Sequence, residues 1–128
     1  MKAIILAAGI ASRLRPLTND RPKCLLKIGN RSLLERTIDA LLENNIREIV
    51  IVTGYLHEML ESFVQTRSPS LSVKFIHNEL YSSTNNIYSL WLALPEVLQE
   101  KEIILLDSDI LFDPLIIKIL LDASHDNC

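Results

Sequence analysis

The sequence predicts a three-layer α/β fold, in which a mostly parallel sheet carries helices on both faces. Two observations predict it. Short apolar runs that suit strands buried on both sides recur along the chain, and most of them are followed by a segment with helical periodicity. The chain has 128 residues, of which 48% are hydrophobic, so it can build one domain with a substantial core. The alternation of apolar runs with helical segments is typical of βαβ units.

The first half of the chain supplies two strands and two helices. Residues 2–8 form an apolar run that suits a buried strand. Ser32 and Glu35 have the spacing of a capping box, so we expect a helix to begin there and to end at two asparagines. A second strand is predicted at 48–54 and a second helix at 56–64. The apolar stripe of the first helix consists of Leu34, Ile38, Leu41 and Leu42.

The second half continues the alternation. We expect a strand at 71–76, a helix at 86–94 and a strand at 102–107. Asp113 is a favourable N-cap for a last helix at 114–121, which begins with a proline. This helix is apolar on nearly all sides, so it should be covered on more than one side. We therefore expect the chain to be the N-terminal part of a longer protein.

Charge and composition exclude several classes of protein. The net charge is −3, which argues against a nucleic-acid-binding protein. Residues 1–36 nevertheless carry eight basic and two acidic side chains, so positive charge is concentrated near the N-terminus. Cys24 and Cys128 form no zinc-binding pattern and suit free thiols of a cytoplasmic protein. No signal peptide or membrane-spanning run is predicted.

The loop that follows the first strand has the features of an anion-binding site. Small residues there let a ligand approach the backbone N–H groups closely. Basic side chains in the same loop can bind phosphate oxygens. Because ligands of parallel sheets bind at the carboxyl ends of strands, this loop is well placed to hold one. The small residues are Gly9, Ala11 and Ser12, and the basic ones include Arg13 and Lys23.

The same loop resembles a known family. ILAAGIASRLRPLTNDRPKCLLKI, residues 5–28, is similar to the signature of nucleotidyltransferases that activate sugar phosphates and related phosphate esters. Ala11 stands where that signature has its second glycine. NELYSSTNNIYSLWLA, residues 78–93, resembles the phosphocholine cytidylyltransferase branch. LLDSDILF, residues 105–112, resembles the element whose aspartate binds Mg²⁺, with Ser108 in place of a glycine.

The resemblance implies a fold and a reaction. The fold would be the Rossmann-like fold of nucleotide-diphospho-sugar transferases, with residues 1–128 as a single nucleotide-binding domain. The reaction would move CMP from CTP, or NMP from another NTP, to phosphocholine, an aminoethylphosphonate or a sugar phosphate, with release of pyrophosphate. Without the later part of the family's chain, residues 1–128 alone should be inactive.

The resemblance also implies roles for single residues. Arg13 and Lys23 would be catalytic, through their hold on the triphosphate. Asp109 would bind Mg²⁺, and Asp107 would be a weak ligand or a partner of Asp109. The residues implied to bind the nucleotide are Ala8, Gly9, Ala11, Ser12, Tyr81, Asn85 and Asn86.

Several alternatives stay open at this point. An ordinary capped helix start could explain Tyr81, Asn85, Asn86 and Tyr88, and Asp107 could be purely structural. The protein could be a sugar-1-phosphate nucleotidylyltransferase that uses another base. It could also be a non-catalytic nucleotide-binding module. The acceptor and the oligomeric state are not predicted, and no membrane or nucleic acid is expected as a partner.

Overall fold

A four-stranded parallel sheet forms the centre of the protein. The computed structural model describes residues 1–123. The strands lie in the order β5–β4–β1–β6, and all three pairings between neighbours are parallel. This arrangement confirms the predicted parallel sheet. The strands are β1 (Lys2–Ala7), β4 (Glu48–Thr53), β5 (Ser72–His77) and β6 (Ile103–Asp107).

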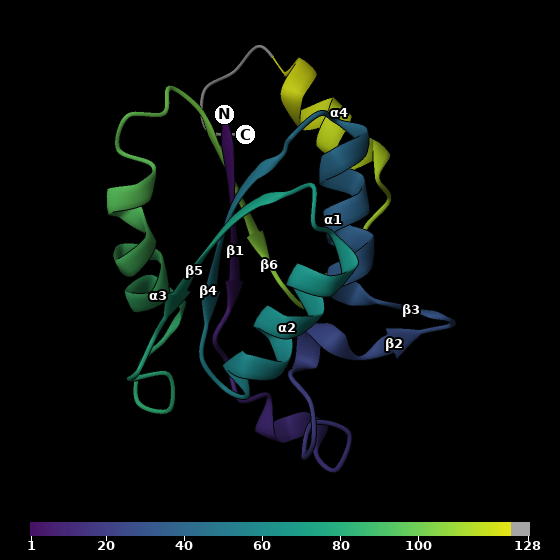
Figure 1. Cartoon of the computed structure of the whole chain (residues 1–128), viewed down its shortest axis with the longest axis vertical. Coiled ribbons are helices and arrows are strands. Elements are labelled where there is room, and N and C mark those ends of the chain that lie inside the picture. The colour runs from purple at the N-terminus through teal and green to yellow at the C-terminus, as the bar shows by residue number, and fades with distance from the viewer. Residues whose placement is uncertain (124–128) are drawn as a thin grey trace.

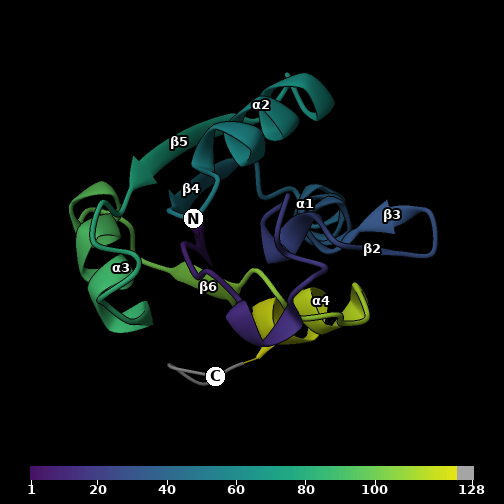
Figure 2. The same cartoon turned by 90° about the horizontal axis from the view of Figure 1, so that it is seen from below.

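Helices cover both faces of this sheet, as the sequence predicts. One face is covered by α1 (Leu33–Glu43), α2 (His57–Arg67) and α4 (Leu115–Asp122), and the other by α3 (Asn86–Ala93). Figure 1 shows α3 on one side of the strands and the other three helices opposite. Figure 2, seen from below, shows the same three layers.

The central strand β1 contributes to the core on both sides. Successive side chains of a strand point to opposite faces of its sheet. Ala3, Ile5 and Ala7 accordingly pack in the cluster that includes α1, α2 and α4, whereas Ile4 and Leu6 pack in the cluster that includes α3. The near-continuous apolar run at 2–8 is therefore the signature of a strand buried on both faces.

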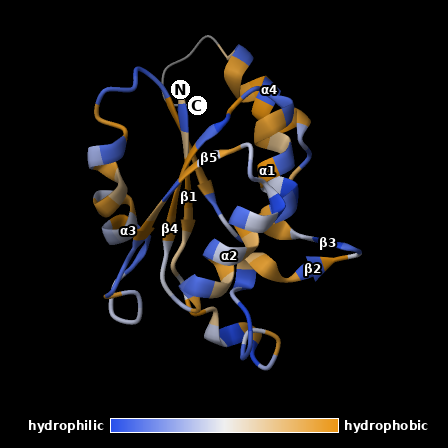
Figure 3. Cartoon of the chain, in the orientation of Figure 1, coloured by the Kyte–Doolittle hydropathy of each residue, from blue (hydrophilic) through white to orange (hydrophobic). Residues whose placement is uncertain are grey.

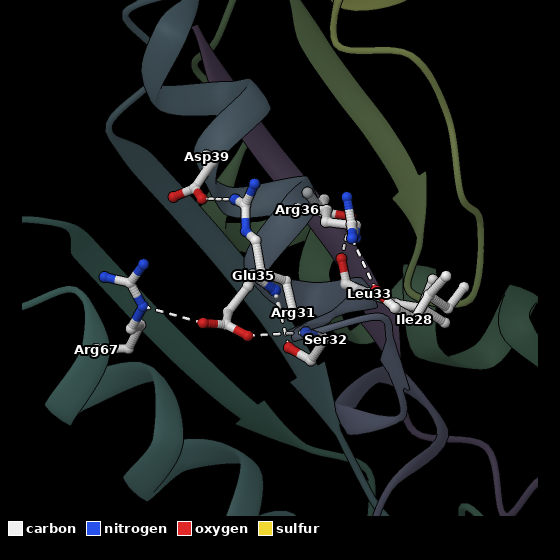
Figure 4. Close-up of polar contacts among 9 residues, drawn as sticks. Ile28, Arg31, Ser32, Leu33, Glu35, Arg36, Asp39 and Arg67 are labelled. Carbon is white, nitrogen blue, oxygen red and sulfur yellow. Dashed lines mark hydrogen bonds and ion pairs between the residues drawn. The ribbon is translucent and has the colours of Figure 1, made fainter.

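The predicted capping box starts α1 (Figure 4). The Ser32 hydroxyl accepts a hydrogen bond from the Glu35 N–H at 3.1 Å, and the Glu35 carboxylate accepts one from the Ser32 N–H at 2.8 Å. The same carboxylate pairs with Arg67 of α2 at 3.1 Å. The Ser32 N–H, with further support from Arg67, lowers the pKa of Glu35 below its ordinary range. Glu35 thus caps α1 and ties it to α2.

The structure also contains short elements that the sequence analysis missed. A hairpin, β2 (Lys27–Ile28) and β3 (Arg31–Ser32), projects beside α1 in Figure 1. Gly29, at φ 70°, occupies the first position of its two-residue turn, where positive φ is required. Two-residue strands are too short to show a period. Three 3-10 turns were also missed: η1 (Ser12–Leu14), η2 (Lys23–Leu25) and η3 (Leu94–Glu96).

Two helices differ slightly from the prediction. Leu56, expected inside the second helix, lies just before α2 with φ 52°. The last helix begins at Leu115, one residue later than expected, so Pro114 and not Asp113 occupies the N-cap position. The Asp113 carboxylate, one residue before the N-cap, accepts a hydrogen bond from the Leu115 N–H at 2.9 Å. No helix within residues 1–123 is long and apolar enough to span a membrane.

Helix α4 is apolar around most of its circumference, as Figure 3 shows by its colour. Ile117 is buried against the sheet, but Leu115, Ile116 and Ile119 are exposed. The expected cover on more than one side is therefore absent from the part of the chain that the structure describes.

Candidate functional site

The carboxyl ends of β1 and β6 border a cavity of about 130 Å³. Gly9 and Ala11 line it from the loop after β1, and Asp107 and Asp109 from the end of β6. Lys23 reaches it from η2. The structure thus brings together five of the residues predicted for the site. Asn86, a sixth predicted residue, lines the cavity together with Leu6, Ala7, Cys24 and Ser108.

Lys23 and Asp109 form an ion pair at this cavity. Both side chains are about one third exposed, at 33% and 38%, so a ligand in the cavity can reach them. Lys23 begins η2 at the end of the basic loop, and Asp109 follows the last residue of β6 by two positions. The pair therefore joins two of the three segments on which the family resemblance rests, residues 5–28 and 105–112.

Asp107 has a different partner. Its carboxylate accepts a hydrogen bond from the Asn86 amide at 3.0 Å. Asn86 is the first residue of α3, so this contact links α3 to the end of β6. Asn86 thereby orients Asp107 at the cavity that both residues line. Its contact with a nucleotide stays a prediction.

The neighbouring Asn85 caps α3. Its side-chain oxygen accepts hydrogen bonds from the N–H groups of Ile87, at 3.1 Å, and Tyr88, at 3.4 Å. The ordinary capped helix start is therefore what the structure shows for Asn85. Its contact with a nucleotide stays a prediction.

The buried Asn78 fixes the start of α3 from the carboxyl end of β5. Its amide donates to the Thr84 hydroxyl at 3.0 Å and to the Ser89 hydroxyl at 3.1 Å. Its side-chain oxygen accepts from the Leu80 N–H at 2.9 Å. A buried amide that is satisfied in this way specifies one arrangement of its surroundings. Asn78, which the sequence analysis did not single out, therefore helps to position Asn86.

Ala11 has the backbone conformation that the family's glycine would favour. Its φ is 53° and its ψ 45°, in the left-handed region. This conformation costs about 1–2 kcal/mol for a residue that has a Cβ. The Ala11 carbonyl accepts hydrogen bonds from the Leu14 N–H and from the Thr18 hydroxyl, both at 3.0 Å. The loop keeps its shape at this position despite the missing glycine.

Other predicted residues lie outside the cavity lining. Ser12 and Arg13 are on the exposed turn η1. Ala8 is buried, and its carbonyl accepts a hydrogen bond from the Tyr55 N–H at 3.2 Å. The Tyr81 ring lies 6.4 Å, between centroids, from that of Tyr55. For these four residues, contact with a ligand stays a prediction.

The charges at the cavity favour a ligand that arrives with a cation. The lining includes one lysine and two aspartates, so its formal charge is −1. A triphosphate alone would be repelled by the aspartates. Two neighbouring carboxylates suit Mg²⁺, which binds one or two protein carboxylates and completes its coordination with phosphate oxygens and water. Within residues 1–123 no group of three or more His, Cys, Asp or Glu side chains could hold a metal ion. The donor set thus fits Mg²⁺ that shares its coordination with a ligand.

Cys24 does not suit a nucleophile, although it borders the cavity. The side chain is buried, and this burial raises the pKa of its thiol to about 12. The thiol is therefore protonated at neutral pH, whereas nucleophilic attack requires the thiolate. Cys128, the other predicted free thiol, lies outside the described residues.

Comparison with known proteins identifies relatives. The family model described as nucleotidyl transferase matches residues 2–127. The choline-phosphate cytidylyltransferase of Streptococcus pneumoniae is 40% identical over 97 residues, which are 76% of this chain and 41% of that protein. The CTP:phosphoglutamine cytidylyltransferase of Campylobacter jejuni is 32% identical over 130 residues, covering 98% of this chain and 50% of that protein.

A solved structure shows the same fold. The structure of CTP:phosphocholine cytidylyltransferase from Streptococcus pneumoniae superimposes with a TM-score of 0.77 and 37% sequence identity. The match covers 89% of this chain and 47% of that chain. This similarity confirms the predicted Rossmann-like fold class. The chain spans half or less of the length of the relatives compared.

Proposed function

Since this chain belongs to the nucleotidyl transferase family, we propose that the protein transfers CMP from CTP to an acceptor that bears a phosphate, and releases pyrophosphate. Two relatives support the choice of CTP, because both are named cytidylyltransferases although their acceptors differ. Phosphocholine is the acceptor we propose. Its nearest chemical substitutes are a phosphonate, such as an aminoethylphosphonate, and phosphate esters other than phosphocholine. Residues 1–128 are the nucleotide-binding domain in this proposal.

The juxtaposition of Lys23 and Asp109 carries the proposal. A basic group that binds phosphate and a carboxylate that suits Mg²⁺ meet at one cavity. Phosphoryl transfer requires little proton chemistry from the protein, and its barrier is lowered chiefly by positioning and by positive charge. The acceptor phosphate has a second pKa near 6, so its attacking oxygen is already ionised at neutral pH. No general base is needed.

The residues of the site then have distinct roles. Lys23 binds oxygens of the triphosphate, releasing its ion pair with Asp109 as the nucleotide enters. Arg13, on the exposed turn beside the cavity, adds positive charge toward the pyrophosphate that leaves. The backbone N–H groups of the loop at Gly9 and Ala11 approach the phosphates closely, because the side chains there are small.

Asp109 and Asp107 would hold Mg²⁺ in this site. When bound, the ion supplies neutralisation of charge on the phosphate oxygens. Asn86 keeps the Asp107 carboxylate oriented toward the cavity. The buried free thiol of Cys24 suits a reducing compartment, so we propose the cytoplasm as the location of the reaction.

The experiment uses the full-length protein that contains this chain. Pyrophosphate release is measured with CTP, UTP, ATP or GTP in the presence of phosphocholine, and then with 2-aminoethylphosphonate and a sugar 1-phosphate as acceptors. We expect CTP with phosphocholine to give the highest kcat/KM. Equal use of the four nucleotides, or a preference for a purine, would overturn the assignment to CTP.

A lysine outside the cavity provides the matched control. Lys27 lies in the exposed strand β2, within a few residues of Lys23. Lys23→Ala should lower kcat/KM strongly, whereas Lys27→Ala should leave it within about twofold of wild type. Equal losses in both variants would show that general basic charge, rather than the position of Lys23, supports activity.

A further inference from the structure

We propose that Tyr55 is a positioning residue that holds the phosphate-binding loop, residues 9–22, in its binding conformation. What the loop binds rests on the proposed function, but the contacts of Tyr55 do not. Its hydroxyl donates to the carbonyl of Thr18 at 2.9 Å and shares its proton with the carbonyl of Asn19 at 3.1 Å. Its backbone N–H donates to the carbonyl of Ala8 at 3.2 Å. Tyr55 therefore contacts the chain just before the loop, at Ala8, and again within it, at Thr18 and Asn19.

A second hydrogen bond carries this restraint to the cavity. The Thr18 side chain is fully buried, and its hydroxyl donates to the carbonyl of Ala11 at 3.0 Å. Ala11 lines the cavity. The contacts thus run from Tyr55 at the carboxyl end of β4, through Thr18, to a residue that faces the ligand.

The conformation of Ala11 explains why such a restraint is needed. An alanine does not favour φ 53°, and a left-handed conformation of this kind persists only where its surroundings over-determine it. The loop around it is otherwise exposed at Ser12, Arg13 and Leu17, so its own packing restrains it little. Thr18 and Tyr55 supply the contacts that fix it.

Gly54 permits the close approach on which Tyr55 depends. A Cβ at this position would lie 2.5 Å from the carbonyl oxygen of Ala8 and 2.6 Å from the Cβ of Tyr81. Only glycine allows the end of β4 to lie so near the end of β1. The N–H of the next residue, Tyr55, can then reach Ala8.

A variant that removes only the hydroxyl tests the proposal in the full-length protein. Tyr55→Phe keeps the ring and loses the two contacts to the loop. One hydrogen bond of this kind corresponds to about a fivefold change in an equilibrium. We expect hydrogen exchange of the hydrogen-bonded loop amides, those of Leu14, Arg15, Leu17 and Asn19, to become about fivefold faster. The KM for the nucleotide should rise by a similar factor, while the KM for the acceptor stays unchanged.

Thr37→Val is the matched control. Thr37 is buried in α1, and its hydroxyl donates to the carbonyl of Leu33 at 3.1 Å, so this variant also loses one hydroxyl-to-carbonyl bond, but one outside the loop. It should leave both loop exchange and the KM for the nucleotide at wild-type values. Thr18→Val, which breaks the next contact in the series, should reproduce the effect of Tyr55→Phe.

Two results would overturn the role of Tyr55. One is loop exchange in Tyr55→Phe at the wild-type rate. The other is an equal acceleration in Thr37→Val, which would reveal general destabilisation. Exchange is measured without substrate, so it remains decisive if the protein prefers another nucleotide than CTP. In that case the proposed function fails, and the positioning role is judged by exchange alone.

Discussion

Lys23 and Asp109 form an ion pair although 86 residues separate them in the sequence. The pair lies at the edge of the sheet, where the loop after β1 meets the end of β6. Because both groups are about one third exposed, the pair adds at most about 1 kcal/mol to the free energy of unfolding. Substitutions here should therefore alter ligand binding and turnover more than stability.

Arg13 provides the simplest test of whether a basic side chain contributes to turnover rather than to stability. It lies on the exposed turn η1, so Arg13→Ala should change the free energy of unfolding by no more than about 0.5 kcal/mol. Turnover in the full-length protein should fall by roughly 10²–10³, as for the loss of a preorganised donor. Denaturant unfolding and pyrophosphate release measure the two quantities. An unfolded Arg13→Ala variant would show that Arg13 is structural.

Ala11→Gly should stabilise the protein. Glycine adopts φ 53° without steric conflict, which relieves about 1–2 kcal/mol, while its greater freedom in the unfolded chain costs about 0.5–1 kcal/mol. We expect a net gain of about 0.5–1 kcal/mol in denaturant unfolding. Ala40→Gly, inside α1, is the control and should destabilise. If both variants destabilise alike, Ala11 does not carry the strain.

Glu35→Gln tests the pH dependence of stability. The folded-state pKa of Glu35 is lowered, chiefly by its hydrogen bond from the Ser32 N–H, so the ionised carboxylate stabilises the fold above the ordinary glutamate pKa of about 4.3. That contribution is lost as the pH falls through the lowered pKa. Glutamine keeps the capping geometry but not the charge.

The free energy of unfolding of the wild type should therefore exceed that of Glu35→Gln by about 1 kcal/mol at pH 7, and this difference should vanish toward pH 2. Unfolding at a series of pH values measures it. Glu43→Gln, at the exposed far end of α1, should show a much smaller difference at pH 7. A difference between wild type and Glu35→Gln that is independent of pH would contradict the role of the charge.

Cys24 should resist alkylation in the folded protein. Its thiol is buried, with a pKa of about 12, so almost no thiolate is present or accessible at pH 8. In a Cys128→Ser background, iodoacetamide should modify Cys24 only as fast as the protein unfolds, and at a normal rate in denaturant. Rapid modification of the folded protein, followed by mass spectrometry, would contradict this assignment.

Much of the fold could be predicted from the sequence, because its signals are local. The run at 2–8 is apolar at every position except Lys2, which identifies a strand buried on both faces. Ser32 and Glu35 mark the start of α1 by spacing alone. The hairpin at 27–32 could not be predicted this way, since two-residue strands have no measurable period and its shape depends on Gly29 and on contacts with α1.

The site was predictable where a residue type carries its own chemistry. Lys23 was identified from its charge in the loop after β1, whereas Asp109 and Asp107 were identified from the family resemblance. The structure brings all three to one cavity. The contacts that support these residues could not be predicted, because they join segments that lie far apart in the sequence. Tyr55 was missed for this reason, although its place directly after Gly54, at the end of a strand, was a usable signal.

The most direct test of the site is a Mg²⁺ titration of pyrophosphate release by the full-length wild type and by Asp109→Asn, beside thermal melts of both. Asparagine keeps the size of Asp109 but loses the charge that would bind Mg²⁺. We predict that Asp109→Asn melts within a few degrees of wild type, needs much more Mg²⁺ for half-maximal activity, and turns over far more slowly. A wild-type rate and a wild-type Mg²⁺ curve in this variant would contradict the account, because Asp109 would then not hold the metal at this cavity.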